Sequence, residues 1–501
     1  MIQPTLEEAR GLAEGCTLIP IAMELFADLK TPVELLRILR AKGRECFLLE
    51  SASGGEGWGR YTFLGFDAEL TVTGDANGAV TVAGGRNGTA AEEEETTCAD
   101  SAPQDPHRTL KRILGAHRSP RIPGFPPFTG GFVGYFAYEY IRHIETSLKF
   151  TGRDDVGFDD FHLMLFRKII AFDNFRQKIF LIVNIGTEDL ETNYPEGVAL
   201  LRDMERLIHL PAAPPPEPDC AAPAFAASFD RESFCAAAEK IKRHIFEGDI
   251  FQCVPSVRFR APYGDDLLNA YRVLRTTNPS AYMFYVRFGD LQLAGASPET
   301  LVSLYGNTAT TYPLAGTCPR TADGEETKAL IDRMLTDEKE LAEHDMLVDL
   351  GRNDLGKICR FGSVKVTEYR SVKKLSHVCH IASKVTGELR EGCDALDVMA
   401  AALPAGTLSG APKLRACGII DGVEGLRRGP YGGAVGYIDF TGNMDLCIGI
   451  RMAVLKDRSV YVQAGAGIVA DSVPAREYEE CRRKAGAMVE ALGGKKHDLA
   501  D

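Results

Sequence analysis

Two pairs of glutamates stand at helical spacing in the C-terminal half of the chain. Glu340 and Glu343 are three residues apart, and Glu477 and Glu480 repeat that spacing. Residues three apart share one face of an α-helix, so each pair presents two carboxylates together. Two such pairs are a candidate site for Mg²⁺, which prefers oxygen ligands. A solvated helix face is the alternative explanation, and spacing alone favours it.

A loop of glycine, serine and threonine spans residues 406–413 and carries Thr407. It leads into a predicted helix with Pro412 in the first turn, where proline is favoured. Backbone N–H groups at such a helix start suit an anion. The loop is not a P-loop, because the GxxxxGK[ST] order is absent.

A second loop covers residues 463–470 and contains Gly465, Ala466 and Gly467. Its Gly-x-Gly-x-x-Ala order superficially matches a dinucleotide fingerprint. Because Pro474 follows shortly and no helix is predicted to start at Gly467, we reject a nicotinamide site. The functional interpretation that remains is close approach of the backbone to a carboxylate, which glycine permits.

Three single side chains also have the chemistry of a site. Glu299 follows a predicted strand and would suit a general acid if its pKa were raised, although a turn glutamate explains it equally. His380 lies in an apolar run, where a histidine is more often part of the core. Arg451 is predicted inside an apolar strand and needs an anionic partner, either structural or a ligand carboxylate.

Strands and helices must position these residues. Apolar or β-branched runs predict strands at residues 47–49, 61–64, 70–73, 179–183, 281–286, 291–294, 308–312, 437–440, 447–454 and 460–463. Apolar spacing of three to four predicts helices at residues 234–245, 326–350 and 475–492. The elements alternate without a regular βαβ rhythm, so we predict an α+β (mixed α/β) fold of layered antiparallel β-sheets flanked by helices.

A proline-rich segment divides the chain near its middle. Six prolines fall within residues 211–223, and proline favours extended, solvated backbone. We therefore predict an N-terminal part at 1–210, a Pro/Ala-rich linker at 211–224 and a C-terminal part at 225–501. The polar run at residues 84–100, with four consecutive glutamates, is predicted to be a solvated loop.

The composition is that of a globular protein with an acidic balance. In 501 residues, 57 Lys and Arg stand against 70 Asp and Glu, which gives a formal charge of −13. This argues against a general nucleic-acid role, which needs a basic face. We expect no secretory signal and no membrane segment, because no stretch approaches the roughly 20 apolar residues that a membrane helix needs. The 13 dispersed cysteines, without a CxxC pair, favour reduced thiols in a cytoplasm.

Ordered motifs over most of the chain resemble one family, the large components of the anthranilate synthases within the chorismate-utilising enzymes. The matching segments are residues 48–51 (LLES), 58–61 (WGRY), 248–252 (GDIFQ), 296–299 (ASPE), 314–317 (LAGT), 343–344 (EH), 406–413, 431–433 (YGG), 463–470 and 477–484. The resemblance implies the family's layered fold. It also implies conversion of chorismate and ammonia into anthranilate and pyruvate, a lyase reaction that uses Mg²⁺ and is the first step of tryptophan biosynthesis.

The resemblance also implies roles for individual residues. The implied catalytic residues are Glu299, as general acid for the leaving hydroxyl, with His380 and Thr407 at the elimination stage. The implied substrate-binding residues are Gly316, Thr317, Tyr431, Arg451, Gly465, Ala466, Gly467 and Lys484. The implied metal ligands are Glu343 and Glu480, with Glu340 and Glu477 as their water-mediated partners.

Feedback inhibition by L-tryptophan is a further implication of the resemblance. The implied inhibitor-binding residues are Glu50, Ser51, Ala281, Tyr282 and Met283, and the N-terminal part is then the regulatory one. The family has proline where this chain has Ala281, a departure that could weaken the packing of the inhibitor. Cys318 is another departure, because the family often has arginine after the Gly-Thr pair.

Two positions distinguish close relatives. Aminodeoxychorismate synthases have a nucleophilic lysine where this chain has Ala315, which cannot form an adduct. Isochorismate and salicylate synthases have a water-activating lysine where this chain has Gln252, a poor base. Both positions favour anthranilate formation. The alternatives are an aminodeoxychorismate synthase component and a non-catalytic regulator that binds chorismate or tryptophan.

The sequence lacks a Gly-x-Cys-x-Gly nucleophile elbow, so we expect no glutaminase on this chain. The resemblance implies ammonia from a separate glutamine amidotransferase subunit, in a heterotetramer of two large and two small subunits. Free ammonia is the alternative nitrogen source.

Overall fold

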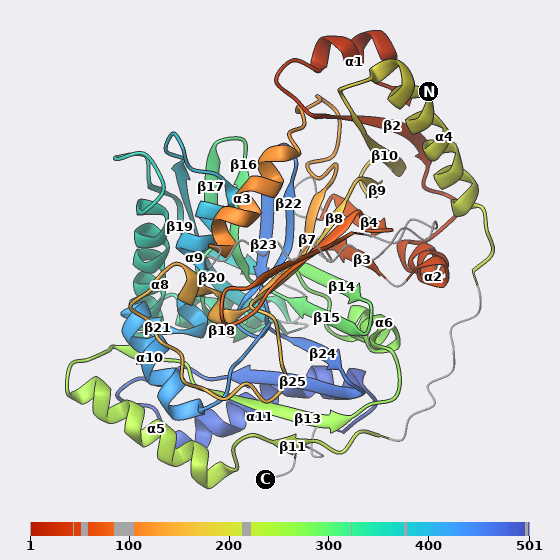
Figure 1. The fold of residues 1–501 in the computed structure, drawn as a ribbon. Coiled ribbons are helices and arrows are strands. Elements are labelled where there is room, and N and C mark those ends of the chain that lie inside the picture. The colour runs from red at the N-terminus through yellow and green to blue at the C-terminus, as the bar shows by residue number, and fades with distance from the viewer. Residues whose placement is uncertain are drawn as a thin grey trace.

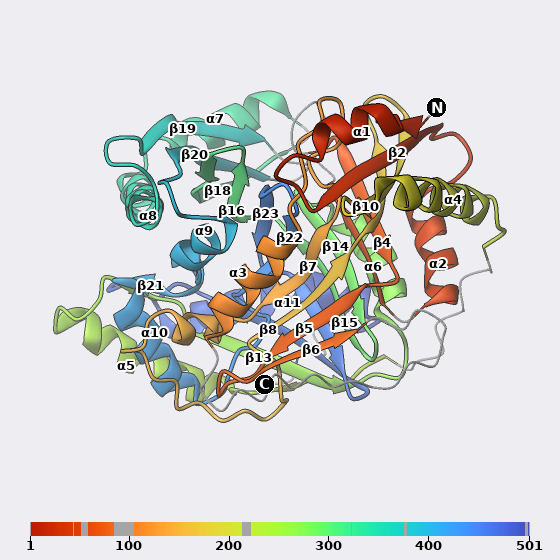
Figure 2. The same ribbon diagram turned by 45° about the horizontal axis from the view of Figure 1, so that its top comes forward.

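Two large antiparallel β-sheets form the framework of the molecule (Figures 1 and 2). The computed structural model describes the chain apart from residues 1, 44, 52–58, 85–104, 213–221, 322, 375–377, 496–498 and 500–501. Within the described part, one sheet has 12 strands and the other has 11. Helices flank both sheets, which confirms the predicted α+β class with layered antiparallel sheets.

The strands of the 12-stranded sheet are, in spatial order, β1 (Ile2–Gln3), β2 (Leu18–Phe26), β10 (Lys178–Gly186), β9 (Lys168–Asp173), β4 (Tyr61–Phe66), β3 (Glu45–Glu50), β14 (Tyr282–Phe288), β15 (Leu291–Ser297), β24 (Met452–Lys456), β25 (Ser459–Gly465), β13 (Ser256–Pro262) and β11 (Ala226–Ala227). Those of the 11-stranded sheet are β18 (Leu314–Pro319), β20 (Val378–Glu388), β17 (Thr308–Thr311), β16 (Thr300–Tyr305), β23 (Met444–Ile448), β22 (Ala434–Asp439), β7 (Gly131–Phe136), β8 (Phe161–Phe166), β5 (Leu70–Gly74) and β6 (Val80–Gly84), with β19 (Lys365–Lys374) beside β20. A short pair joins β12 (Gln252–Cys253) to β21 (Gly410–Ala411).

The helices are α1 (Leu6–Leu12), α2 (Pro32–Lys42), α3 (Pro106–Ala116), α4 (Leu190–Ile208), α5 (Arg231–Phe246), α6 (Leu267–Thr277), α7 (Gly324–Met334), α8 (Glu338–Gly356), α9 (Ala395–Ala402), α10 (Lys413–Glu424) and α11 (Pro474–Ala491), with 3₁₀ turns η1 (Tyr138–His143) and η2 (Gly406–Leu408). Helices α6 and α11 contact the 12-stranded sheet, whereas α8 and α9 contact the 11-stranded one. Among the described helices, none is both long and apolar enough to cross a bilayer.

The short apolar runs of the sequence form strands as predicted. They correspond to β3, β4, β5, β10, β14, β15, β17, β22 and β25, and three of the runs extend one residue beyond their strand, at Ala281, Tyr312 and Phe440. The predicted helices at 234–245 and 475–492 correspond to α5 and α11.

The single helix predicted at residues 326–350 is wrong, because two helices occupy this stretch. Helix α7 ends at Met334, and α8 begins after Asp337. The Asp337 carboxylate accepts hydrogen bonds from the N–H groups of Lys339 at 2.9 Å and Glu340 at 3.3 Å, which is N-cap geometry. The cap fixes the start of the helix that carries the first glutamate pair.

The single strand predicted at 447–454 is also wrong, because the chain changes sheets within it. Strand β23 belongs to the 11-stranded sheet and β24 to the 12-stranded one, and residues 449–451 connect them. Arg451 therefore lies between strands, in a left-handed conformation with φ of +52°. A non-glycine residue rarely adopts this conformation, so the surrounding structure must hold it.

A second crossing between the sheets lies beside the first. The chain leaves the 12-stranded sheet at the end of β15 and enters the other sheet at β16, so Glu299 lies on this crossing. The N–H of Ala296 donates to the carbonyl of Arg451, and the N–H of Ile448 donates to the carbonyl of Glu299, both at 3.0 Å. The two connections are thus joined by backbone hydrogen bonds.

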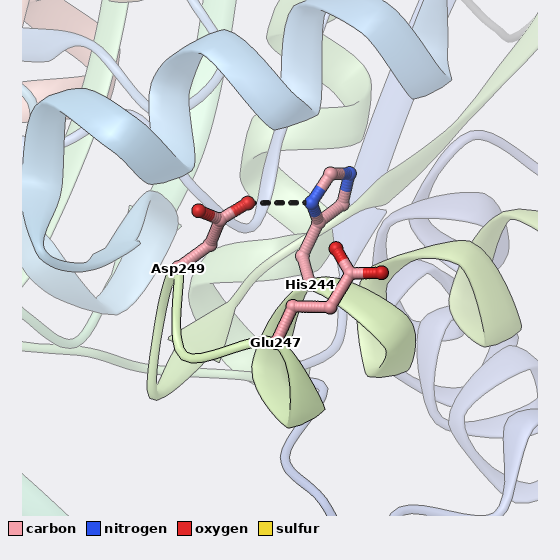
Figure 3. A group of neighbouring side chains, drawn as sticks. All are labelled: His244, Glu247 and Asp249. Carbon is pink, nitrogen blue, oxygen red and sulfur yellow. Dashed lines mark hydrogen bonds and ion pairs between the residues drawn. The ribbon is translucent and has the colours of Figure 1, made fainter.

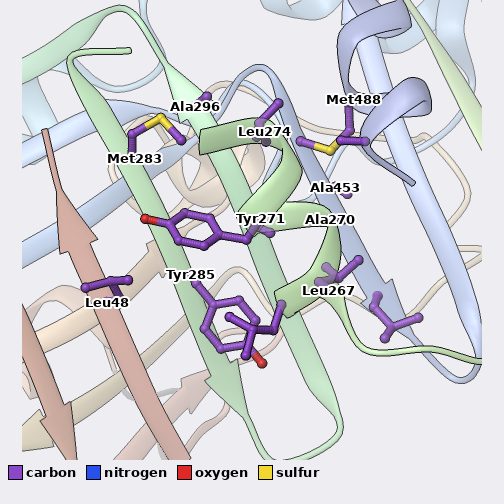
Figure 4. Close-up of a cluster of buried hydrophobic side chains, with 14 of the residues drawn as sticks. Leu48, Leu267, Ala270, Tyr271, Leu274, Met283, Tyr285, Ala296, Ala453 and Met488 are labelled. Carbon is purple, nitrogen blue, oxygen red and sulfur yellow. The ribbon is translucent and has the colours of Figure 1, made fainter. Parts of the chain in front are cut away.

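Large apolar clusters hold the layers together. One contains side chains of both sheets, and within it Phe63 of β4 meets Tyr437 of β22 edge to face, with ring centroids 5.8 Å apart. Another lies between the 12-stranded sheet and its helices, where Tyr271 and Leu274 of α6 cover Met283 of β14 (Figure 4). Such packing of apolar surface is the main source of stability for a layered domain.

Both sheets contain strands from either side of the predicted linker. In the 12-stranded sheet, β3 pairs with β14, and in the other β7 pairs with β22. Most of the proline-rich segment lies outside the described residues, as does most of the polar run at 84–100. The boundaries at 1–210, 211–224 and 225–501 stay a prediction.

Candidate active site

One cavity of about 640 Å³ collects nearly all the residues predicted to bind or transform a ligand. Its wall includes Glu299, Gly316, Thr317, Glu340, Glu343, His380, Thr407, Tyr431, Arg451, Gly465, Gly467, Glu477, Glu480 and Lys484. Ala466 is missing from the described lining residues. It is buried, and its N–H donates to the Pro255 carbonyl at 3.1 Å, so this donor is already used.

Glu299 has the electrostatics of a general acid. Although the residue keeps some exposure to the cavity, its carboxyl group is surrounded by other atoms. This burial raises the pKa of Glu299 to about 7, against the opposing effects of a hydrogen bond from Thr407 and the positive charge of Lys484. Thr407 Oγ1 donates to Glu299 Oε1 at 2.9 Å. The carboxyl can therefore hold or release a proton near neutral pH.

The loop that carries Thr407 differs slightly from its prediction. Pro412 is the N-cap of α10 and lies one residue before the first turn. Lys413 follows it and is buried, with Nζ 2.8 Å from Asp354 Oδ2 and 2.9 Å from the Ala402 carbonyl. The positive charge at this helix start is thus paired within the protein, and the loop supplies the cavity with a hydroxyl.

Two cationic side chains face the acid across the cavity. Lys484 Nζ donates to the Gly465 carbonyl at 3.0 Å and lies 3.3 Å from Glu480 Oε1. Arg451 donates through Nη1 to the Lys484 carbonyl at 3.5 Å, and burial lowers the pKa of its guanidinium. A buried guanidinium favours an anionic ligand, which would restore the solvation it has lost.

Thr317 and His380, predicted separately as a substrate-binding and a catalytic residue, lie side by side on neighbouring strands. The two residues are cross-strand partners in β18 and β20, and Thr317 Oγ1 lies 3.0 Å from His380 Nδ1. Nδ1 is also 3.0 Å from the Gly316 carbonyl, which can only accept. Burial lowers the pKa of His380, so the ring is neutral with its proton on Nδ1. Nε2 then keeps a lone pair and can act as a base.

Glycine is required where the second loop meets the cavity wall. A Cβ on Gly465 would lie 2.7 Å from the Pro255 carbonyl and 3.0 Å from the Tyr431 hydroxyl, and one on Gly467 would lie 2.7 Å from Gln252 Nε2. Gln252 is buried, and its Oε1 has no hydrogen-bond partner among the described residues. The cavity thus contains a neutral amide acceptor where a base would be needed to activate water.

The four glutamates come from two helices that meet at the cavity. Burial, followed by the charge of Glu343, raises the pKa of Glu340. Burial raises the pKa of Glu477, and the charge of Glu480 adds to it. Like charges of this kind are stabilised by a divalent cation, and carboxylates are ligands that Mg²⁺ prefers. The donor types therefore fit the metal, while no three of these four described carboxylates have oxygen atoms that all lie within 4.8 Å of one another.

A different group of side chains satisfies a stricter distance criterion for metal ligands. Within the described ranges, His244, Glu247 and Asp249 are the one group of three or more whose ligand atoms all lie within 4.8 Å of one another (Figure 3). Asp249 already accepts hydrogen bonds from His244 at 2.8 Å and Arg415 at 2.6 Å. The charge of Asp249 is thus matched, as that of Glu480 is by Arg483 and Lys484. The group differs from the four glutamates in lying outside the lining of the cavity.

A second cavity of about 400 Å³ lies between the sheets and collects the predicted inhibitor residues. Glu50, Ser51, Ala281, Tyr282 and Met283 all line it. Aromatic side chains from both sheets complete its wall, namely Tyr61, Phe63, Phe284, Tyr305, Tyr312 and Tyr437.

The carboxylate of Glu50 is engaged within the protein. Arg275 donates to it through Nε at 2.6 Å and Nη2 at 3.0 Å, and Tyr271 donates a further hydrogen bond. An incoming ammonium group must therefore share or replace these donors.

Sequence reasoning missed one acidic residue of this second cavity. Asp445 lines it and accepts hydrogen bonds from the hydroxyls of Tyr282 at 2.8 Å and Tyr305 at 2.9 Å. Burial raises the pKa of Asp445 to about 6 against those two hydrogen bonds. The sequence did contain a signal for Asp445, because it is a charged residue within an apolar run. A charge within an apolar run is also what singled out Arg451.

The cavity combines carboxylates with two cations, and the comparison of the sequence with known families identifies the class of protein: the chorismate-binding enzymes. The model of that family matches residues 45–490, and the chain belongs to the family. It is 42% identical to anthranilate synthase component 1 of Acetivibrio thermocellus over 500 residues, which cover 98% of this chain and 99% of the relative. It is also 42% identical to the component 1 protein of Pseudomonas aeruginosa, with 97% and 98% covered.

Solved structures agree with the sequence comparison. Anthranilate synthase component I from Streptococcus pneumoniae superposes with a TM-score of 0.75 and 35% identity, covering 93% of this chain and 99% of that one. The menaquinone-specific isochorismate synthase of Escherichia coli superposes with a TM-score of 0.70 over 97% and 98%, but at 18% identity it supports the fold alone.

Proposed function

We propose that the protein is the large subunit of an anthranilate synthase and converts chorismate and ammonia into anthranilate and pyruvate. This would be a carbon–oxygen lyase reaction and the first step of tryptophan biosynthesis. The observation that carries the proposal is a carboxyl group with a pKa of about 7, Glu299, in one cavity with two cations and four glutamates. The names of relatives that match over nearly the full chain support it.

Binding of the substrate follows from the charges around the cavity. Chorismate carries two carboxylates, one on the ring and one on the enolpyruvyl side chain. Arg451, Lys484 and the Tyr431 hydroxyl would bind the side-chain carboxylate, with the backbone around Gly465 close enough for contact. Gly316 and Thr317 would face the ring. Such fixed charges replace the hydration that the dianion loses on entering the site.

The first chemical step would be addition of ammonia and loss of the 4-hydroxyl. The nitrogen lone pair forms a bond to the ring carbon next to the carboxylate-bearing carbon, the ring double bonds shift, and the C4–O bond breaks. Glu299 would donate its proton to the leaving oxygen, which departs as water. Ammonia needs no base to become a nucleophile, and Gln252 Oε1 would accept one of its N–H groups.

The second step would be elimination of pyruvate. Removal of the proton from the carbon that bears nitrogen supplies electrons for an aromatic ring, and the bond between the ring carbon and the enolpyruvyl oxygen breaks. The enolate of pyruvate leaves with the electron pair of that bond and takes up a proton from solvent. His380 would take this proton on Nε2, while its Nδ1 proton is fixed by the Gly316 carbonyl. Thr407 would hold Glu299, the acid that is ionised after the first step.

Glu343 and Glu480 would hold Mg²⁺, with Glu340 and Glu477 contacting it through water. The ion would neutralise the ring carboxylate and fix its position when bound. The raised pKa values of Glu340 and Glu477 support this assignment, because burial and then the charge of a neighbouring glutamate raise each of them, and a cation would relieve both effects.

The second cavity would bind L-tryptophan as feedback inhibitor. Its aromatic wall suits an indole ring, and Glu50 and Ser51 suit an ammonium group. Arg275, which now pairs with Glu50, would supply a partner for the amino acid's carboxylate if the pair separated. Because Ala281 stands where the family has proline, the inhibitor would lose one ring contact.

We propose a separate glutamine amidotransferase subunit as the ammonia source, in a heterotetramer of two large and two small subunits. The label component 1 on the relatives supports a partner of this kind. The cytoplasm is the proposed compartment, since the described cysteines are free thiols.

One assay tests the activity. The purified chain is incubated at pH 7 with chorismate, Mg²⁺ and an excess of ammonium salt, and the products are identified by mass and fluorescence. Anthranilate with equimolar pyruvate supports the proposal. Accumulated aminodeoxychorismate would make it an aminodeoxychorismate synthase component, and unchanged chorismate with intact binding would make it a non-catalytic regulator.

A further inference from the structure

The hydroxyl of Tyr282 links the inhibitor cavity to Thr300, the residue next to Glu299. Its ring lines the inhibitor cavity, and its hydroxyl donates to Asp445 Oδ1 at 2.8 Å. The same oxygen lies 2.9 Å from Thr300 Oγ1. Thr300 follows Glu299 directly in the chain. Tyr282, a wall residue of the inhibitor cavity, is thus hydrogen-bonded to the neighbour of the proposed general acid.

The direction of these hydrogen bonds follows from the chemistry of their members. An ionised carboxylate only accepts, so Asp445 fixes the Tyr282 proton toward itself. The Tyr282 oxygen must then accept from Thr300, and the three groups form a single chain of donors. Tyr305 donates to the second oxygen of Asp445 at 2.9 Å. A ligand that contacts either tyrosine would therefore change the strength of the hydrogen bonds in this series.

The backbone around Thr300 has little freedom to absorb a displacement. Thr300 is buried, begins β16 and pairs with Cys447 of β23, and the register shifts between Thr300 and Val302. On its other side, Glu299 is held by the hydrogen bond from Ile448 N–H. Irregular pairing of this kind re-aims side chains near sites. Because Thr300 and Glu299 are consecutive residues, a movement of Thr300 would be passed to the backbone that carries the Glu299 carboxyl.

We propose that Thr300 is a positioning residue for Glu299, and that a ligand in the inhibitor cavity acts on the general acid through the Tyr282–Thr300 hydrogen bond. The ligand-dependent part rests on the proposed feedback by tryptophan. A ligand that displaces Tyr282 or attracts its hydroxyl leaves Thr300 without its acceptor and changes the aim of Glu299. Coupling of this kind is reciprocal, so chorismate must weaken tryptophan binding by the same factor.

The test compares Thr300→Val, which removes the hydroxyl at nearly constant shape, with Thr300→Ser, which keeps it. Tyr282→Phe is the second variant, because it keeps the ring and loses the hydroxyl. Tryptophan affinity is measured by calorimetry, with and without chorismate, and inhibition by ammonia-dependent turnover. The wild type shows whether feedback exists at all.

Thr300→Val and Tyr282→Phe should bind tryptophan within about threefold of wild type but require at least about tenfold more of it for half inhibition, since typical couplings are 5–150-fold. Thr300→Ser should behave as the wild type. The pH dependence of turnover gives a second readout. Lys484 is the charged group that acts on the Glu299 carboxyl, and the cavity also contains Glu340, Glu343, His380, Arg451, Glu477 and Glu480. The part of the pH profile assigned to Glu299 should move in Thr300→Val and return in Thr300→Ser.

Inhibition of both hydroxyl-free variants at wild-type tryptophan concentrations would overturn the proposal. So would a parallel loss of binding and inhibition, which would make Thr300 a wall residue only. A wild type that neither binds tryptophan nor is inhibited would remove the feedback function. The positioning role of Thr300 would then be tested by the pH dependence of turnover alone. An unchanged apparent pKa of Glu299 in Thr300→Val would contradict that role.

Discussion

Thr407 Oγ1 lies 2.9 Å from Glu299 Oε1, although the two residues are 108 positions apart. The short pair of β12 and β21 holds the end of the Thr407 loop, and the crossing from β15 to β16 holds Glu299. The hydroxyl favours the ionised carboxyl, whereas burial favours the protonated one. The balance of these two effects gives the site its working pH.

Replacement of Glu299 by glutamine should remove the general acid without changing the shape of the cavity. We expect turnover to fall by about 10²–10⁴-fold, the usual contribution of a positioned acid or base. Chorismate binding, measured by calorimetry, should persist within a few-fold, because the charges of Arg451 and Lys484 remain. Full retained turnover would exclude Glu299 as the acid.

Activity should decrease as pH rises through the pKa of Glu299. The acid must be protonated, so kcat/KM for chorismate should fall above about pH 7, the pKa that burial gives to this carboxyl in the free enzyme. The concentration of unprotonated ammonia is held constant across the series, so that its own titration does not hide the limb. A profile with no limb between pH 6 and 8.5 would contradict this assignment.

The same carboxyl should make the wild-type protein less stable at high pH. Its folded pKa, about 7, lies above the ordinary 4.5, so the folded state binds the proton more tightly and loses stability as pH rises through that range. The loss is on the order of 3 kcal/mol. Glu299→Gln should escape it, so its gain in urea midpoint over the wild type should be larger at pH 8 than at pH 5. An equal difference at both pH values would contradict the buried carboxyl.

Glu480→Gln should weaken Mg²⁺ binding. Even partners of metal ligands contribute about 10–100-fold to metal affinity, so loss of a ligand should cost on the order of 100-fold. The matched control is Glu479→Gln, which removes an exposed carboxylate one residue away that pairs with Arg482 at 3.5 Å. Calorimetric titration with Mg²⁺ and the Mg²⁺ dependence of turnover give two readouts. Equal affinity in both variants would remove Glu480 from the metal site.

Ser51→Phe should relieve tryptophan inhibition while ammonia-dependent turnover persists. The larger ring would occupy part of the 400 Å³ cavity, so the affinity for tryptophan should fall by at least about tenfold, or about 1.4 kcal/mol. Ser51→Ala removes the hydroxyl but leaves the volume open, so it separates the loss of a hydrogen-bonding group from the filling of the cavity. Unchanged inhibition in Ser51→Phe would place the inhibitor elsewhere.

Much of the site could be predicted from the sequence, because its chemistry is written in residue types at fixed spacing. The glutamate pairs share helix faces as i, i+3 spacing requires, and both pairs face one cavity. The break before α8 was also readable, since Asp337 with Glu340 three residues later is a capping signal. The break was missed because apolar residues at helical spacing continue on both sides of Asp337.

Other features depend on long-range pairing that no local pattern contains. Periodicity describes a strand but not the sheet it joins, so the passage of the chain from β23 to β24, and with it the left-handed Arg451, could not be predicted. The burial of Asp445 depends on tyrosines from β14 and β16, and the use of the Ala466 N–H depends on Pro255. In each case the partner is distant in sequence.

The two crossings between the sheets have a mechanical consequence. Glu299 and Arg451 are fixed to connections that span the same gap, so a slide of one layer along the other acts on both at once. The relative position of these two candidate-site residues therefore depends on how the two sheets are aligned. Any ligand that shifts one sheet along the other would displace both residues, and no lid or hinge would be needed for this effect.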